Sequence, residues 1–475
     1  MKPNIVFVMS DQQRRNSMGI YGNRYVHTPH LDAVAQSATV YDHCYCNAPV
    51  CTPSRACTLT GKTLTGHGVY DLFDIMPRNE KLLSYYLKEL GYDTALVGKL
   101  HVSGTEFEAY ERNPGDGFDI YELCHEPSIY LDGPLNAYAK WLGENFPDEL
   151  EALKKEGRQR KFRRAETHFS TWVSERSAEI IRNRDKNKPL YLQVGYFDPH
   201  NPYDHYPKAC DGLLHEEYYE APLQDDSVLP EAMQLERKYH SPKALGAQSK
   251  EEGVRNMRRG YYAGVSFLDQ QVQKIIQALK DEGIYDNTLF IYTSDHGDML
   301  GDHDLYSKGA MFYEHGVNVP LIVKFPFQTE GTRSDRLVQL NDLFATMYTA
   351  AGGDENFRFE SLPLQGERER NIAVTEYRAC GKFDIEGFPH PLHGTMVRNK
   401  EWKLCLFHDT NEAQLFHLTE DPNELSNLYG RAETAAITQE LMNQYLQLTA
   451  WRDRQYNMSR GGLSAMPAFA YLHKK

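Results

Sequence analysis

Short apolar runs rich in β-branched residues alternate with amphipathic helical patterns along the first three quarters of the chain. We expect five of these runs to form strands: Ile5–Met9, Thr94–Val97, Leu190–Tyr196, Thr288–Thr293 and Leu321–Phe325. Near-continuous apolar strands separated by helices are typical of a parallel sheet that is buried on both faces. The pattern therefore predicts an α/β fold with a large, mostly parallel central sheet flanked by helices.

Two segments between these runs repeat apolar residues at helical spacing. The first includes Leu83, Leu87 and Leu90 and is followed by Gly91, a residue type that commonly ends helices. The second carries an apolar stripe made of Val265, Leu268, Val272, Ile275, Ile276 and Leu279. The highly charged segment over residues 136–186 is expected to be a solvated helical excursion.

The pattern changes after about residue 355, where closely spaced alternating segments replace the long apolar runs. Gly394–Arg398, Trp402–Phe407 and Gln414–Leu418 indicate a small antiparallel sheet, and a helix over residues 432–451 is expected to pack on it. We therefore divide the chain into a catalytic α/β unit, residues 1–360, and a smaller C-terminal α+β subdomain, residues 361–475.

Charge and cysteine content narrow the class of protein. The 475 residues carry 52 Lys and Arg against 66 Asp and Glu, a formal net charge of −14, which argues against a nucleic-acid partner. No window approaches the roughly 18 apolar residues of a membrane-spanning helix, and the apolar start is too short for a signal peptide. Eight cysteines in a chain of this length make no disulfide framework. We therefore expect a cytoplasmic protein without a membrane segment.

Polar residues with metal-binding chemistry follow two of the predicted strands. Asp11 and Gln12 come directly after the first strand, and Asp295 and His296 follow the fourth. Ligands of parallel sheets bind beyond the carboxyl ends of the strands, and carboxylates suit a hard divalent cation. The alternative is that each Asp only caps the turn or helix that follows its strand.

Cys51 begins the segment Cys51-Thr52-Pro53-Ser54-Arg55, which indicates the start of a helix because proline suits the first helical turn. A helix N-terminus favours an anion, and Arg55 adds a planar donor group for an oxyanion. The same position would lower a thiol pKa. A tyrosine-phosphatase loop is excluded because Cys57 stands where that loop needs arginine, and the cysteines form no Cys-x-x-Cys pair for zinc. A buried structural cysteine remains an alternative.

Two more strand ends, and the segment after the fourth strand, carry candidate side chains. Lys99 and His101 follow the second predicted strand, His200 follows the third, and Lys308 follows the acidic segment after the fourth. Taken one at a time, each is most simply a surface or satisfied core residue. Taken together with the carboxylates and Cys51, they predict one site that holds a cation and an anionic substrate.

At this point the chain resembles type I sulfatases of the alkaline phosphatase superfamily, through motifs in the family's order over nearly the whole length. Cys51–Arg55 fits the family's Cys-x-Pro-x-Arg signature, Gly98–His101 its Gly-Lys-x-His element, and Pro199–Tyr203 its Pro-His-x-Pro-Tyr element. Ser294–Gly309 is similar to the second metal segment, and Leu415–Leu428 to the C-terminal tail.

The resemblance implies an activity and a site. Cys51 would be oxidised to formylglycine by a maturation enzyme, and its hydrate would attack sulfur to give a covalent sulfo-enzyme intermediate, with sulfate then expelled by the second hydroxyl. One divalent cation is implied, Ca²⁺ in the first place, with Mg²⁺ and Mn²⁺ as alternatives. The implied metal ligands are Asp11, Gln12, Cys51, Asp295 and His296. The implied catalytic residues are Cys51, Arg55, Lys99, His101, His200 and Lys308, with His200 or Lys308 as proton donor and His101 as base.

Two other functions stay open. Gln12 and His296 replace the more common Asp and Asn, as in related phosphonate monoester hydrolases, so a phosphonate monoester or phosphodiester hydrolase with the same formylglycine is the alternative. A binding protein whose Cys51 is never oxidised is a third hypothesis. The substrate would be a small-molecule or carbohydrate sulfate ester; residues 45–50 are similar to choline sulfatases. Candidate rim residues are Arg112, His125, His205, Tyr377, His390 and His393. The aromatic content permits a homo-oligomer without requiring one.

Overall fold

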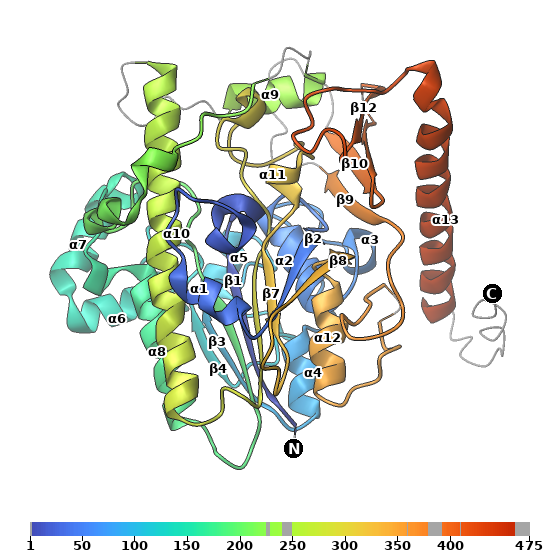
Figure 1. Cartoon of the computed structure of the whole chain (residues 1–475). Coiled ribbons are helices and arrows are strands. Elements are labelled where there is room, and N and C mark those ends of the chain that lie inside the picture. The colour runs from blue at the N-terminus through green and yellow to red at the C-terminus, as the bar shows by residue number, and fades with distance from the viewer. Residues whose placement is uncertain are drawn as a thin grey trace.

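The computed structural model describes residues 2–224, 229–239, 249–358, 360–378, 392–408 and 410–460. Within these ranges an eight-stranded sheet has the order β4-β3-β5-β1-β6-β7-β2-β8 (Figure 1). Its strands are β1 (Asn4–Ser10), β2 (Thr39–Tyr45), β3 (Asp93–Gly98), β4 (Ile120–Leu123), β5 (Leu190–Gly195), β6 (Thr288–Ser294), β7 (Leu321–Lys324) and β8 (Thr332–Gln339). All five predicted strands are present.

The sheet is parallel except at β7, which pairs antiparallel with both β6 and β2. The central strand β1 pairs in parallel with β5 and β6, so that Val8 lies opposite Val194 and Tyr292. Because β7 runs the other way, the long loop after β6 stays at the carboxyl edge until β7 begins. This reversal keeps Asp295 and Lys308, which lie at the start and in the middle of that loop, at the same edge.

Alternate residues of β1 enter two different cores. Ile5 and Phe7 pack in one hydrophobic cluster and Val6 and Val8 in the other, as the period of two in a strand requires. Figure 1 shows α8 and α10 on one side of the sheet and α4 and α12 on the other. The prediction of a mostly parallel sheet covered on both faces is confirmed.

The helices of the described residues lie around the two sheets, and several short 3-10 turns lie between them. Their bounds are α1 (Pro29–Ala35), α2 (Cys51–Thr60), α3 (Leu64–His67), α4 (Leu83–Glu89), α5 (Thr105–Tyr110), α6 (Ala137–Asn145), α7 (Pro147–Glu156), α8 (Phe169–Asn183), α9 (Glu231–Tyr239), α10 (Lys250–Asp281), α11 (Glu314–Val317), α12 (Asp342–Ala350) and α13 (Ala435–Arg460). The charged segment is helical as expected, but the expectation of a solvated excursion is wrong for α8, which buries Trp172 and Ile181 in the core.

A second sheet, with the antiparallel order β12-β11-β10-β9, lies toward the C-terminal end of the chain. Its strands are β9 (Ala373–Arg378), β10 (His393–Arg398), β11 (Trp402–Phe407) and β12 (Glu412–His417). One face packs under α13 through Val397 and Leu404, and the other joins the main core through Met396 and Cys405. The predicted antiparallel sheet with a helix on it is confirmed, and the division at residue 360 stays a prediction.

No helix in the described part of the chain combines the length and the apolar character that crossing a lipid bilayer requires. The seven cysteines among the described residues are buried and free.

Candidate active site

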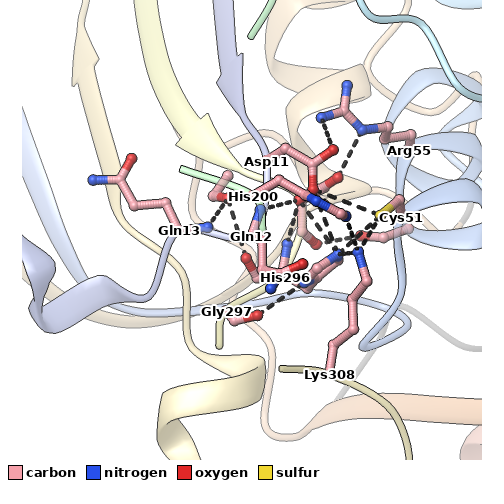
Figure 2. A network of polar contacts seen from close by, with 12 residues as sticks. Asp11, Gln12, Gln13, Cys51, Arg55, His200, His296, Gly297 and Lys308 are labelled. Carbon is pink, nitrogen blue, oxygen red and sulfur yellow. Dashed lines mark hydrogen bonds and ion pairs between the residues drawn. The ribbon is translucent and has the colours of Figure 1, made fainter. Parts of the chain in front are cut away.

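Four side chains from distant parts of the chain converge at the carboxyl edge of the large sheet (Figure 2). Asp11 follows β1, Asp295 and His296 follow β6, and Cys51 is the first residue of α2. One ligand atom from each lies within 4.8 Å of the others, and all four residues are buried. The sequence prediction that two strand ends and the Cys51 helix meet at one site is confirmed.

Gln12 is held at the edge of this cluster by its backbone. It adopts the left-handed conformation with φ 66°, and its N–H donates to Asp295 Oδ1 at 3.0 Å. Its side-chain Nε2 donates to Asp298 Oδ2 at 2.5 Å. Gln12 Oε1 is buried and has no hydrogen-bond partner among the described residues. An unpartnered buried carbonyl oxygen is a suitable ligand for a hard cation.

The tautomer of His296 follows from its neighbours. Its Nδ1 lies 2.9 Å from the carbonyl oxygen of Gly297, which can only accept a hydrogen bond, so Nδ1 carries the proton. The lone pair is therefore on Nε2, which lies 3.1 Å from Cys51 Sγ. A backbone carbonyl that orients an imidazole in this way is typical of metal-ligating histidines. Two carboxylates, this imidazole and the Gln12 oxygen together fit a divalent cation.

Cys51 stands where an anion is favoured. It is 1% exposed and follows Val50, the N-cap of α2. Burial and the Asp11 carboxylate raise the pKa of the Cys51 thiol, but Lys308, Lys99 and His296 outweigh them and the net pKa is lowered. The position therefore stabilises a negatively charged atom on residue 51.

Lys308 links Cys51 to His200. Its Nζ lies 2.8 Å from Cys51 Sγ and 2.9 Å from His200 Nε2 (Figure 2). His200 Nδ1 donates to the backbone carbonyl of Asn201 at 2.6 Å, so Nε2 accepts a hydrogen bond from Lys308. Burial and Lys308 hold the pKa of His200 well below its usual range, so the imidazole is neutral.

Arg55 and Lys99 contact the carboxylates. Arg55 Nε donates to Asp295 Oδ2 at 2.7 Å, and Arg55 Nη2 lies 3.5 Å from Asp11 Oδ2. Lys99 Nζ forms an ion pair with the same Asp11 oxygen. Burial raises the pKa of Asp11, but Lys99, Lys308 and Arg55 together hold it well below the usual range. These cations keep the Asp11 carboxylate ionised in a buried place.

His101 reaches the site through Thr52, the residue after Cys51. Its Nε2 lies 2.7 Å from Thr52 Oγ1, and its backbone has φ 57°. Glu108 holds this left-handed turn, since its carboxylate accepts hydrogen bonds from the backbone N–H groups of His101, Val102 and Ser103. Burial and neighbouring cationic groups lower the pKa of His101 well below its ordinary value.

Of the proposed rim residues that the structure describes, one lies against a catalytic side chain. His125 packs edgewise on His101 with ring centroids 3.8 Å apart. Arg112 is paired with Asp116, His205 is buried against Arg158, and Tyr377 is buried in β9. His393 is exposed on β10, and His390 lies outside the described residues.

Sequence reasoning missed three polar residues that support the site. Tyr203 donates to Asp298 Oδ2 at 2.6 Å and forms with it the polar surroundings of the Gln12 amide. Tyr203 lies in the Pro199–Tyr203 motif and Asp298 in the Ser294–Gly309 segment, so the sequence contained a signal for both residues. Glu108 had no such signal, because its role depends on the turn that follows β3.

Two solved structures share this architecture. The phosphonate monoester hydrolase of Agrobacterium radiobacter aligns with a TM-score of 0.77 at 21% identity over 95% of this chain and 96% of its own. A structure in complex with its substrate D-glucosamine-2-N,6-O-disulfate aligns with a TM-score of 0.75 at 21% identity over 96% of this chain and 98% of its own. These alignments show that the chain shares the fold of both structures.

The family itself is shown by the sequence: residues 3–353 match the family model described as Sulfatase, and residues 301–451 match the model described as N-sulphoglucosamine sulphohydrolase, C-terminal. The arylsulfatase of Clostridium perfringens is 27% identical over 499 residues, which cover the whole of both chains. The chain belongs to the sulfatase family and is a sulfuric ester hydrolase.

Proposed function

We propose that this sulfatase hydrolyses a carbohydrate sulfate monoester with formylglycine, formed from Cys51, and one divalent cation. The observation that carries the proposal is the position of Cys51 at the start of α2, within the Cys51–Arg55 signature and against Lys308 and His296. The complex with a sulfated glucosamine supports a sulfated sugar as substrate. A maturation enzyme would be needed as a partner.

Formylglycine supplies, when formed, a hydrate with one hydroxyl to attack sulfur and a second to release sulfate, an exit that serine or cysteine lacks. The residues around position 51 are arranged for that chemistry. Lys308 and the N-terminal turn of α2 place positive charge where the attacking and sulfate oxygens would lie. Arg55 contacts the carboxylates of Asp11 and Asp295, and Lys99 contacts the carboxylate of Asp11. Both cations therefore act through the proposed metal ligands.

Lys308 is the proton source that the geometry supports for the leaving alcohol. His200 Nε2 accepts a hydrogen bond from Lys308, so the proton on that contact belongs to the ammonium group. His200 then holds Lys308 in place, and Lys308 itself passes its proton to the oxygen of the leaving alcohol. His101 is the proposed base of the second step. Its lowered pKa keeps the imidazole neutral. His101 contacts Thr52, which is the residue directly after position 51.

Asp11, Gln12, Asp295 and His296, together with the modified Cys51, would hold the cation. Oxygen donors dominate this set, which is why we propose Ca²⁺, with Mg²⁺ or Mn²⁺ as alternatives. The cation supplies, when bound, a positive charge that polarises the attacking hydroxyl. The buried free cysteines among the described residues are consistent with a reducing compartment, and we propose the cytoplasm.

One observation favours a second activity. Gln12 removes a negative charge from the ligand set, and the fold is shared with a phosphonate monoester hydrolase. Hydrolysis of phosphonate monoesters or phosphodiesters at the same site is therefore the alternative.

Two measurements test the proposal. Mass spectrometry of the peptide that contains Cys51 should show the aldehyde, which is lighter than the thiol, in active preparations. Rates on an aryl sulfate and on the matched aryl phosphonate ester should favour the sulfate. An unmodified Cys51 in fully active enzyme would contradict the formylglycine, and a preference for the phosphonate would favour the second activity.

A further inference from the structure

A second polar cavity of about 240 Å³ lies next to the metal-ligand segment. We call it the Arg14 cavity. It is lined by Arg14, Asn16, Arg24, Tyr218, Arg258 and Asp302, among others. These residues come from the segment after β1, from the 218–223 loop, from α10 and from the loop after β6. The cavity is thus a meeting point of four segments and is separate from the catalytic side chains.

The Arg14 cavity has more positive than negative charge among its buried groups. Asp302 is the buried carboxylate between two arginines, with its oxygens 2.7 Å from Arg14 Nη2 and 2.6 Å from Arg258 Nη2. His315 Nδ1 lies 3.3 Å from Asp302, but burial and Arg14 lower the pKa of His315 to about 3, so it is neutral. One carboxylate therefore faces two guanidinium groups, and an excess positive charge in a buried place favours a bound anion.

Arg14 also has an unused donor. It is 2% exposed, and its Nε donates to Asn16 Oδ1 at 2.6 Å while Nη2 is taken by Asp302. Arg14 Nη1 is buried and has no hydrogen-bond partner among the described residues. A buried guanidinium N–H without an acceptor is costly, and an oxyanion in the cavity would supply that acceptor.

Aromatic rings also line the cavity. Arg24 is exposed, with its guanidinium 3.8 Å from the centre of the Tyr218 ring. Tyr25 packs edge to face on Tyr219 and Tyr262, with centroids 5.6 and 5.5 Å apart. Rings beside a few fixed charged groups are typical of small-molecule sites, in which the charged groups set the orientation.

The Arg14 cavity is separated from the catalytic cluster by Tyr261. The hydroxyl of Tyr261 accepts from the Arg14 backbone N–H and donates to the Gln12 carbonyl oxygen, both at 2.8 Å. The side chain of Arg14 has no contact with Cys51 or its ligand partners in the described residues. A ligand bound at Arg14 is therefore distinct from the sulfate group that is hydrolysed.

We propose that the Arg14 cavity binds an oxyanion group, a carboxylate or a sulfate, through the free donor of Arg14. The group could be a free inorganic anion or the charged group of an acidic sugar, and both use the same recognition chemistry. This site goes beyond the proposed function and does not depend on it.

Calorimetric titration of a Lys308→Ala protein tests this, because that change weakens sulfate binding at the catalytic site. We expect one remaining site for inorganic sulfate or for glucuronate. Tighter binding of sulfate would identify a free anion, and tighter binding of glucuronate an acidic sugar. In the Lys308→Ala background, Arg14→Lys keeps the positive charge beside Asp302 but removes the planar set of guanidinium N–H donors. This change should weaken binding about 10- to 100-fold. Arg24→Ala changes only an exposed side chain and should weaken binding several-fold.

The matched control is Arg182→Ala, which removes an exposed arginine of α8 and should leave the affinity unchanged. Absence of saturable binding of either probe in the Lys308→Ala protein would overturn the proposal. Unchanged affinity in the folded Arg14→Lys protein would also overturn it. If Arg14→Lys does not fold, Arg24→Ala decides: unchanged affinity overturns the proposal, and weakened affinity supports it.

Discussion

The ammonium nitrogen of Lys308 lies 2.8 Å from the sulfur of Cys51, although the two residues are 257 positions apart in the chain. The contact exists because β7 runs against its neighbours, so the loop that carries Lys308 remains at the carboxyl edge of the sheet. The catalytic role proposed for Lys308 depends on this arrangement.

Lys308→Met should lower kcat/KM about 10²- to 10⁴-fold, because it removes both a charge beside the sulfate and the proton source. If Lys308 supplies the proton, the loss should be larger for a carbohydrate sulfate than for an aryl sulfate with a good leaving group. Steady-state rates on the two substrates measure this. Lys274→Met on the exposed side of α10 is the control. Equal losses on both substrates would show that Lys308 acts through charge alone.

Cys51→Ala should abolish turnover, by about 10³-fold or more, while the fold is kept, since the side chain is small and surrounded by rigid elements. Cys51→Ser should give at most a single turnover, because serine offers no second hydroxyl to expel sulfate. A burst experiment with an aryl sulfate separates the two variants. Sustained turnover by Cys51→Ser would refute a role for the hydrate.

Chelation of divalent cations should lower both the activity and the Tm. Asp11 and Asp295 are buried close together, and removal of a bound cation leaves their repulsion balanced only by Arg55 and the lysines. Thermal unfolding with a chelator, followed by separate addition of Ca²⁺, Mg²⁺ and Mn²⁺, measures the effect and ranks the ions. An unchanged Tm and activity after exhaustive chelation would argue against the cation.

Glu108→Gln should change how stability depends on pH. Burial raises the pKa of Glu108 from 4.5 to about 7, although three backbone N–H groups oppose this shift. Between these values the folded state binds more protons than the unfolded state, so the contribution of Glu108 to stability falls as pH rises. Relative to the wild type, Glu108→Gln should therefore gain up to about 1.4 kcal/mol per pH unit across this range.

Urea unfolding of both proteins at several pH values between 4.5 and 7 checks the Glu108 prediction. Parallel curves would mean that Glu108 does not titrate in this range. Steady-state kinetics of the Glu108→Gln protein give a second test. A lower kcat at an unchanged KM would show that Glu108 positions His101.

Lys403→Met should destabilise the protein by about 3–5 kcal/mol, because it leaves the buried Glu424 carboxylate without its cation and leaves Glu314 with the more distant Arg398. Lys403 Nζ is buried, 2.9 Å from Glu314 Oε1 and 2.7 Å from Glu424 Oε1. It also donates to the carbonyl oxygen of Phe312 at 2.8 Å. Lys400→Met is the matched control, since Lys400 pairs with Asp335 in solvent and its loss should leave the free energy of unfolding nearly unchanged. Equal effects of both changes in urea unfolding would contradict the prediction.

The parts of the fold that could be predicted are those with a local signal. β1 and β6 are continuous apolar runs, and the polar residues after them are adjacent in sequence, so the sequence predicts both strands and the polar side chains that follow them. β2 was missed because Asp42 and His43 interrupt its pattern at an irregular pairing with β8. β8 was missed because its first half is polar and exposed.

The residues of the site also divide into those that the sequence predicts and those that it does not. The motif residues were predicted to meet, and Cys51, Lys308, His200 and His296 do so. That Arg55 contacts Asp295 and not Cys51 could not be predicted, because its direction depends on packing between α2 and the sheet. Arg112, His205 and Tyr377 were proposed as rim residues but contact other parts of the protein. Distance along the chain says little about which loop side chains face a site.

The burial of Cys51 also sets an order of events during synthesis. Its contact with His296 joins residues 245 positions apart, which at roughly 5–20 residues per second takes about 10–50 s to be translated. Once β6 is in place, α2 is covered and the Cys51 side chain is 1% exposed. Any enzyme that oxidises Cys51 must therefore act on the nascent or unfolded chain within that interval. The rate of translation and the supply of that enzyme would then determine what fraction of the finished molecules is active.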